Sequence, residues 1–199
     1  MTTTRVPTPV AGARQALLTA AVTELTEHGH AGISLRAVAR RAGLSHAAPK
    51  YHFGDRAGLL TAVATQGFHD LATALSAVHA ADPEARLATL GQAYIDFGLA
   101  HPALFDLMFR AVELDQDDAG LQQAQQSAIA HLAAAAGEMS GPHRIPASQL
   151  TVMAWALVHG LVVLARDGSL RDPDAGDDPP AVSVLAHSIA ATFSRLAAR

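Results

Sequence analysis

Apolar residues recur along the chain at the three-to-four-residue spacing of an amphipathic helix, and no segment alternates polar and apolar residues for long. Alanine and leucine, which both favour helix, dominate the sequence. The first periodic segment spans roughly residues 12–28, with Leu17 and Leu25 on its apolar face, and Gly29 is placed to end it. The pattern predicts an all-α protein of about nine helices.

Two short helices are predicted next. Ser34 is placed to cap a helix over residues 34–42, and Ser45 is placed to cap another that ends near Phe53. Gly43 lies between them and can supply a left-handed turn. Two short helices joined by a glycine-containing turn, with another helix packed beneath, are the parts of a helix-turn-helix. Counted from Ser45, Pro49 is the fourth residue of its helix and forfeits at most the first intrahelical hydrogen bond.

The rest of the chain predicts six more helices. Proline is favoured at the first helical position, so Asp82-Pro83 and Pro102 each mark a helix start. The six predicted segments are residues 56–80, one opening at 82–83, one starting at 102, and residues 119–136, 147–166 and 182–197. Glycine, proline and aspartate predict loops near residues 140–146 and over 167–180.

Charge is distributed unevenly along the chain, whose formal net charge is −4. The first 60 residues hold seven basic and three acidic side chains, and the remainder holds seven basic and fifteen acidic ones. A basic N-terminal part on an acidic body favours DNA binding by the N-terminal part alone. Residues 1–11 are predicted to form a disordered arm.

The most apolar stretch, Leu150 to Ala165, is interrupted by Thr151 and His159 and is shorter than the roughly 18 residues of a membrane span. We therefore expect a soluble, cytoplasmic protein with no membrane partner. A helix this apolar should be buried, here against a second copy of the chain. The predicted homodimer interface uses helices 147–166 and 182–197, through Trp155, His159, Gly160, Val163, Leu185, Ile189 and Phe193.

Neither a metal site nor an enzyme is predicted. The chain has no cysteine, and its eleven histidines show no His-Glu-x-x-His or similar set. No Gly-x-Ser-x-Gly motif and no phosphate-cradling glycine loop occur either. His159 is better explained as a packed, hydrogen-bonded side chain than as a metal ligand. We expect no cofactor.

The succession Leu-Leu-x-Ala-Ala, Glu-His-Gly, Ser-Leu-Arg-Ala-Val-Ala-Arg-Arg-Ala-Gly-Leu-Ser and His-Phe-Gly-Asp-Arg-Ala-Gly-Leu-Leu within residues 17–60 closely resembles the N-terminal domain of TetR-family transcriptional regulators. The resemblance implies a DNA-binding domain at 12–56 and a ligand-sensing, dimerising body at 57–199. It also implies that helix 34–42 supports the segment from Ser45 to His52 in the major groove, with Arg56 near a phosphate. The DNA-binding residues expected are Ser34, Arg36, Ser45, His46, Ala47, Lys50, Tyr51, His52 and Arg56.

Two features depart from the pattern of many relatives. The position two residues before His52 holds Lys50, where tyrosine is common, and Pro49 lies inside the recognition helix. Both leave open which side chains read bases. Lys50, the only lysine, is expected at a phosphate or, as an alternative, at a guanine edge.

The body carries Trp155-Ala-Leu-Val-His159-Gly160 and His101-Pro-Ala-Leu-Phe-Asp-Leu-Met-Phe109, which resemble a Trp-His-Gly subclass of TetR C-terminal domains. Aromatic side chains at helical spacing predict either a ligand cavity or plain core. The cavity residues expected are Tyr94, Phe97, Phe105, Met108, Phe109 and Trp155. The function expected is a ligand-responsive repressor that binds a palindromic operator as a homodimer. The alternative is a helical dimer that binds a ligand or partner without binding DNA.

Overall fold

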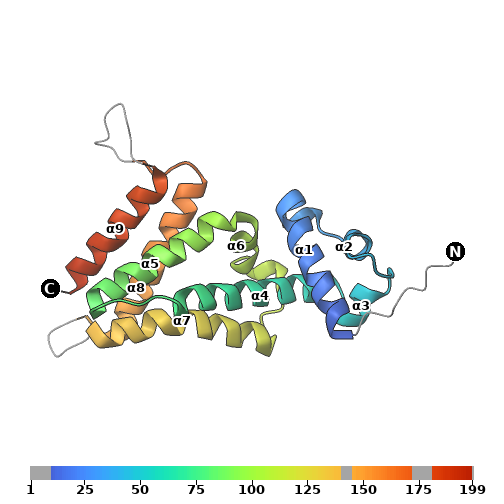
Figure 1. The fold of residues 1–199 in the computed structure, drawn as a ribbon, viewed down its shortest axis with the longest axis horizontal. Coiled ribbons are helices and arrows are strands. Elements are labelled where there is room, and N and C mark those ends of the chain that lie inside the picture. The colour runs from blue at the N-terminus through green and yellow to red at the C-terminus, as the bar shows by residue number, and fades with distance from the viewer. Residues whose placement is uncertain (1–9, 140–144, 172–180, 199) are drawn as a thin grey trace. The chain divides into compact units, whose positions relative to one another are not determined.

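The computed structural model describes residues 10–139, 145–171 and 181–198 (Figure 1). Within these residues all the regular structure is helical. The helices are α1 (Val10–Gly32), α2 (Leu35–Arg41), α3 (Ala48–Phe53), α4 (Arg56–Ser76), α5 (Pro83–Ala100), α6 (Pro102–Met108), the 3-10 turn η1 (Ala111–Glu113), α7 (Ala119–Met139), α8 (Ala147–Arg166) and α9 (Val182–Ala197). The predicted fold class is confirmed.

Most predicted helix starts follow from local capping chemistry. The Ser34 hydroxyl accepts a hydrogen bond from the Ala37 amide at 3.2 Å, and the Asp82 carboxylate accepts one from the Ala85 amide at 2.8 Å. Gly29 has a φ of 68°, so it interrupts α1 as predicted, although helical bonding resumes until Gly32. η1 was not predicted, because one turn leaves no periodic signal.

Three expectations for the elements are wrong. Ser45 does not cap α3, because the helix begins at Ala48 after Ala47, which makes no side-chain cap bond. Pro49 is therefore the second helical residue, where the missing amide costs no intrahelical bond. At the N-terminus, Val10 already lies in α1, so the predicted arm is too long. Residues 1–9 and most of the two predicted loops lie outside the described residues.

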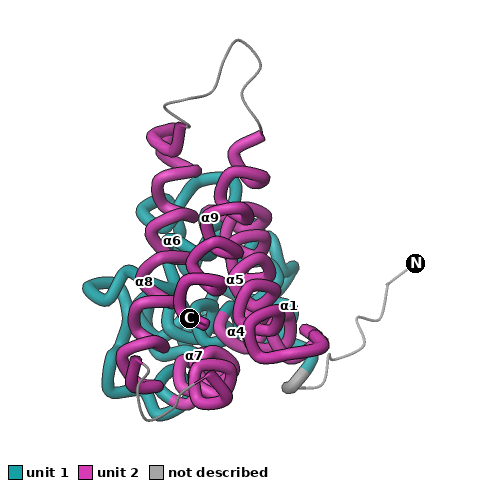
Figure 2. Tube along the Cα trace, turned by 90° about the vertical axis from the view of Figure 1, so that its left-hand side faces the viewer, with its two compact units in different colours: residues 1–67, 103–122 teal, residues 68–102, 123–199 magenta. Residues whose placement is uncertain are grey.

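The structure divides into two compact units (Figure 2). Unit 1 comprises residues 1–67 and 103–122, and unit 2 comprises residues 68–102 and 123–199. The core of unit 1 includes Leu17 and Leu25 of α1, Val38 of α2, and Leu59 and Leu60 of α4, all at most 1% exposed. Residues 103–122 belong to this unit although they are distant from the rest of it in sequence. The predicted domain boundary at residues 56–57 stays a prediction.

In unit 2, α5 packs against both α8 and α9, and α8 packs against α9. Gly91 of α5 allows the close approach, since a Cβ built there would lie 3.2 Å from Val158 Cγ1 and 3.4 Å from Ala190 Cβ. Small residues at the centre of the contact thus let three helices meet around one point.

By length and composition, α8 is long and apolar enough to cross a membrane. About a third of its most apolar 18-residue stretch is buried within the chain. The expectation that this segment is too short is wrong by that criterion, because α8 extends beyond the apolar run at both ends. The same criterion is met by core helices of soluble proteins, so the finding is weak evidence for a membrane.

Candidate nucleic-acid interface

The turn between α2 and α3 is fixed by backbone geometry. Gly43 has a φ of 66°, the left-handed region that glycine adopts without steric cost. Its amide donates to the Arg40 carbonyl at 3.1 Å, and the Leu44 amide donates to the Ala39 carbonyl at 3.0 Å. These two bonds form a Schellman motif, which satisfies carbonyls at the end of α2. The fixed turn sets the course of the chain from α2 toward α3.

α3 is short, and it is fixed at both ends. Pro49 is buried, and the Gly54 amide donates to the Lys50 carbonyl at 2.9 Å to close the helix. Asp55 then accepts a hydrogen bond from the Gly58 amide at 2.9 Å and so caps α4. The helix leaves two of its side chains exposed: Lys50, and Tyr51, which is 78% exposed.

Most of the predicted DNA-binding residues lie on one stretch of unit 1 and are accessible. Ser45, His46 and Ala47 are exposed in the α2–α3 turn, and His52 is half-buried in α3. Ser34 is exposed, but its hydroxyl is used as the α2 cap. Arg36 is exposed on α2 and makes no ion pair with any residue in the described ranges. These placements leave the predicted site free to meet DNA, although its contacts stay a prediction.

Arg40 was not included in the predicted site, yet it lies one helical turn after Arg36 and is also exposed. Arg14 of α1 was missed as well, and its guanidinium lies 5.3 Å from the Phe53 ring centroid, near the end of α3. The i, i+4 spacing could have identified Arg40. No signal in the sequence links Arg14 to Phe53, because the two are far apart along the chain.

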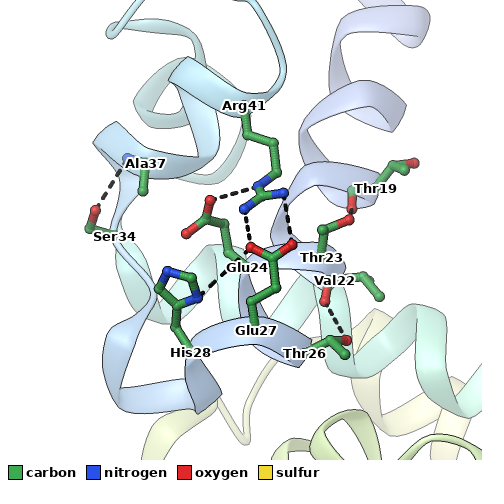
Figure 3. Close-up of polar contacts among 10 residues, drawn as sticks. All are labelled: Thr19, Val22, Thr23, Glu24, Thr26, Glu27, His28, Ser34, Ala37 and Arg41. Atoms are coloured by element: carbon green, nitrogen blue, oxygen red, sulfur yellow. Dashed lines mark hydrogen bonds and ion pairs between the residues drawn. The ribbon is translucent and has the colours of Figure 1, made fainter.

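Arg41, unlike Arg36 and Arg40, has an ion-pair partner among the described residues, and Figure 3 shows its guanidinium beside Glu24 and Glu27 of α1. Its Nε donates to Glu24 Oε1 at 2.6 Å, and both of its terminal nitrogens donate to the Glu27 carboxylate. Glu24 is only 3% exposed, so burial alone would raise the pKa of its carboxyl. The hydrogen bond from Arg41 outweighs burial and lowers that pKa. Arg41 therefore fastens α2 to α1.

Arg56 is also engaged within unit 1. Its guanidinium donates to Glu113 Oε2 at 2.7 Å, and to the carbonyl oxygens of His30 at 2.7 Å and Ile33 at 3.3 Å. Its side chain is 38% exposed. Sequence reasoning placed Arg56 near a phosphate and could not foresee these contacts, because Glu113 comes 57 residues later.

The predicted cavity residues form two groups. Tyr94 and Phe97 are buried on α5 and Trp155 is half-buried on α8, all in unit 2. The other three belong to unit 1, where Phe105 and Met108 are buried, and the rings of Phe105 and Phe109 lie 4.9 Å apart. The structure thus brings together Tyr94 with Trp155, and Phe105 with Phe109.

A polar cluster joins α5 to α8 inside unit 2. Trp155 Nε1 donates to Tyr94 Oη at 3.2 Å, and Tyr94 Oη lies 3.1 Å from His159 Nδ1. Tryptophan can only donate, so the Tyr94 hydroxyl oxygen accepts the bond from Trp155, while the tautomer of His159 sets which partner donates in the second bond. Burial raises the pKa of Tyr94 and lowers that of His159, which favours the neutral form of each side chain.

The residues predicted for a dimer interface lie on α8 and α9. Trp155 and His159 are half-buried with Tyr94 of their own chain as a partner, and Val163 is exposed. Leu185, Ile189, Phe193 and Gly160 are half-buried. The exposed apolar residues that the prediction missed on these helices are Val152, Met153, Leu164, Val182, Val184 and Leu196. Among the described residues, no group of three or more histidine or acidic side chains could hold a metal ion.

Two family models match the chain. The model described as bacterial regulatory proteins, tetR family, matches residues 17–63. The model described as tetracyclin repressor-like, C-terminal domain, matches residues 87–188, which is more than half of the chain. Together they cover both the helix-turn-helix and the helices that carry the polar cluster.

Several solved structures are similar to the chain. A protein with unknown function from Rhodococcus sp. RHA1 is 32% identical, with a TM-score of 0.81 and 100% of both chains covered. A bacterial regulatory protein in the tetR family from Rhodococcus RHA1 is 17% identical, with a TM-score of 0.68 and coverage of 93% of this chain and 96% of that one. The fatty acid degradation regulator FadR from Bacillus halodurans is 13% identical, with a TM-score of 0.67 and coverage of 96% and 97%. The last two likenesses support the fold alone. None of the curated proteins matches the chain.

Proposed function

The chain belongs to the TetR family of bacterial regulatory proteins, and from that premise we propose that it is a ligand-responsive repressor that binds a palindromic operator as a homodimer. It is a DNA-binding transcriptional regulator, as the family is. Two copies of α3 enter successive major grooves, and a ligand that favours another spacing of the two copies lowers operator affinity. Such a protein acts in the cytoplasm, where its operator is.

The observation that carries this proposal is the fixed turn before an accessible α3. The Schellman motif at Gly43 and the closing bond at Gly54 hold the short helix at both ends. Lys50 and Tyr51 extend from α3 into solvent, and Arg36 and Arg40 add positive charge on α2. Charge on α2 suits the phosphates, while α3 supplies the side chains that can reach base edges.

Side chains in the C-terminal body favour a small, mainly apolar ligand that is held by few polar groups. Tyr94, Trp155 and His159 form a hydrogen-bonded cluster between helices that are otherwise packed through apolar side chains. The motif Trp155, His159 and Gly160 also supports membership of a Trp-His-Gly subclass. Phe97 lies one turn from Tyr94 on α5 and completes the lining that we propose.

The homodimer rests on the apolar surface of α8 and α9. Met153 and Leu164 of α8 are each 45% exposed, and Leu196 of α9 is 62% exposed. Large apolar side chains at helical spacing on two adjacent helices suit a four-helix bundle with the same helices of a second copy. This interface leaves one α3 on each copy to meet one half of the operator.

Selection of DNA from a random pool tests the function directly. We expect the full chain to enrich a near-palindrome whose half-sites lie about one helical turn apart. A gel shift with that DNA should be abolished by competitor of the same sequence but not by scrambled DNA. A Tyr51→Ala variant should bind more weakly, whereas Glu138→Gln on α7 is a control outside the interface. A protein that forms dimers but enriches no sequence would instead be a helical ligand- or partner-binding protein without DNA binding.

A further inference from the structure

Arg56 joins three segments of unit 1 that are separate in sequence. It is the first residue of α4, and two of its nitrogens hold the carbonyls of His30 and Ile33 at the end of α1 and in the following turn. Its remaining terminal nitrogen holds Glu113 of η1 at 2.7 Å. We call Arg56, Glu113 and these two carbonyls the Arg56 cluster.

The cluster is electrostatically matched. The hydrogen bond from Arg56 holds the pKa of the Glu113 carboxyl below its usual value, although partial burial of that carboxyl opposes the shift. His30 Nε2 lies 3.7 Å from Glu113 Oε1, and Arg110 adds a further positive charge near this carboxylate. A charged, paired Glu113 therefore keeps the guanidinium in the geometry that reaches both carbonyls.

Two other contacts attach residues 103–122 to the first half of α4. The Asp115 amide donates to Thr61 Oγ1 at 2.9 Å, and Thr61 is only 3% exposed. A Cβ built on Gly67 would lie 2.7 Å from Met108 Sδ, so α6 packs closely on α4 there. The start of α4 is thus held along three turns by a segment that lies outside the helix-turn-helix in sequence.

We propose that Arg56 is a positioning residue for DNA binding, and that Glu113 supplies the carboxylate that holds it in place. α4 begins two residues after Gly54, which closes α3, so fixing Arg56 fixes the exit of the recognition helix. The inference rests on the proposed function and adds to it a part of the DNA-binding unit contributed by η1. On this proposal, the carboxylate of Glu113, which lies in the acidic part of the sequence, is needed for the chain to bind DNA, although DNA is itself negatively charged.

The rival role for Arg56 is a direct phosphate contact, and three variants separate the two roles. Glu113→Gln removes a negative charge, which by simple electrostatics strengthens DNA binding. Arg56→Lys keeps the charge that a phosphate needs but cannot make three directed N–H contacts. Arg56→Gln removes both the charge and the contacts. Glu138→Gln, which removes a carboxylate paired with Arg86 in unit 2, is the matched control.

The measurement is the affinity of each full-chain variant for the selected operator over a range of salt concentrations, with thermal unfolding of the same samples. We expect all three variants to bind about 5- to 30-fold more weakly than wild type, the factor for losing one or two charge-assisted hydrogen bonds. Their salt slope should stay that of wild type, and the double variant Arg56→Gln/Glu113→Gln should be no weaker than either single change.

Either of two results overturns the proposal. If Glu113→Gln and Arg56→Lys bind as wild type does while Arg56→Gln lowers the salt slope by about one unit per subunit, Arg56 is a phosphate contact. If the variants melt earlier but bind with wild-type affinity when folded, the cluster is only structural. A wild-type chain that binds no operator refutes the proposed function instead. In that case amide exchange in the α1–α2 turn still tests the cluster, since Glu113→Gln should speed exchange there and an unchanged rate contradicts it.

Discussion

The side chain of Glu24 is only 4% exposed, and Arg41 is its partner. A buried charged group that loses its partner is costly, so Arg41→Ala should lower the thermal midpoint at neutral pH by about 2–4 °C or more. Arg40→Ala, which alters an exposed neighbour on the same helix, should have a smaller effect. Scanning calorimetry of the three proteins measures the difference, and equal midpoints for the two variants would show that the pair contributes nothing specific.

The same pair makes stability depend on pH. The pKa of Glu24 lies below its ordinary value of 4.5 in the folded chain, so the unfolded chain takes up a proton first as the pH falls. The contribution of Glu24 to stability is therefore complete above about pH 4.5 and is lost as the pH falls toward the folded pKa. In Arg41→Ala the largest cause of the lowered pKa is lost, and burial is opposed only by the smaller effects of His28 and Arg40. The difference in unfolding free energy between wild type and this variant should thus shrink on acidification, and a constant difference in urea titrations would contradict the pairing.

Lys50 is the only lysine, which gives it a direct chemical test. An amine-selective reagent can modify only Lys50 and the N-terminal amine, and operator DNA should protect Lys50 if α3 lies in the groove. If its ammonium contacts a phosphate, Lys50→Ala should weaken binding to all sequences alike and lower the salt slope by about one unit per subunit. A base contact would instead relax the preference at one operator position. Equal labelling with and without specific DNA would place Lys50 away from the interface.

At the residue scale the sequence predicted a set of DNA-binding residues, which stays a prediction, but not which arginines already have partners within the chain. Arg36, Arg40 and Arg41 are equivalent in a helical pattern. Only the packing of α1 on α2 gives Arg41 two carboxylates, from residues 14 and 17 positions away. Pairing across helices depends on tertiary structure, which helical periodicity in one segment does not contain.

Among whole elements, helix boundaries were predictable where a cap or a proline sets them. Ser34, Asp82 and Pro102 mark the starts of α2, α5 and α6, because each acts through its own local backbone. The start of α3 was wrong, since Ser45 has the chemistry of a cap but lies in the turn, and the helix starts three residues later. A capping residue shows where a helix can begin, and here α3 begins at Ala48, so that buried Pro49 takes an early helical position that proline favours.

The meeting of α5, α8 and α9 at Gly91 predicts a contrast between two glycines. Gly137→Ala, at an exposed position of α7, places its methyl more than 4 Å from every described atom beyond its chain neighbours and its own helix backbone, and should stabilise the chain by about 0.5–1 kcal/mol through helix propensity. Gly91→Ala gains the same propensity but crowds Val158 and Ala190, so it should gain little or lose stability. Gly91→Leu should be destabilising by about 1–3 kcal/mol. Urea unfolding measures all three, and an equal gain from both alanines would rule out close packing at Gly91.

Over the whole molecule, the units do not follow the order of the sequence. Residues 103–122 join unit 1 through Glu113, Asp115 and Met108, although they follow a helix of unit 2. Periodicity located the α-helices, though not η1, and carried no information on which helices pack together. The family likeness supplied the functional division of the chain, and the structure adds that the DNA-binding unit includes a segment from the middle of the sequence.

A substitution at Gly160 tests the homodimer, because a single copy of the chain leaves space for a side chain at this position. Apart from its chain neighbours and the backbone of its own helix, no atom of the described residues lies within 4 Å of a Cβ built on Gly160, so we expect Gly160→Leu to fold as a single chain. Met153, Val163 and Leu164 are exposed on the same helix, and a second copy packed there would meet the new side chain at the closest approach of the two helices. Wild type should therefore sediment at twice the chain mass of 20.6 kDa at micromolar concentration, and Gly160→Leu should shift toward the monomer. Its operator affinity should fall as well, because each half-site must then be bound separately.

Gly137→Leu, which adds the same side chain at an equally open position on α7, should stay dimeric. A wild-type monomer that binds the palindrome, or a Gly160→Leu variant that dimerises as wild type does, would place the interface elsewhere.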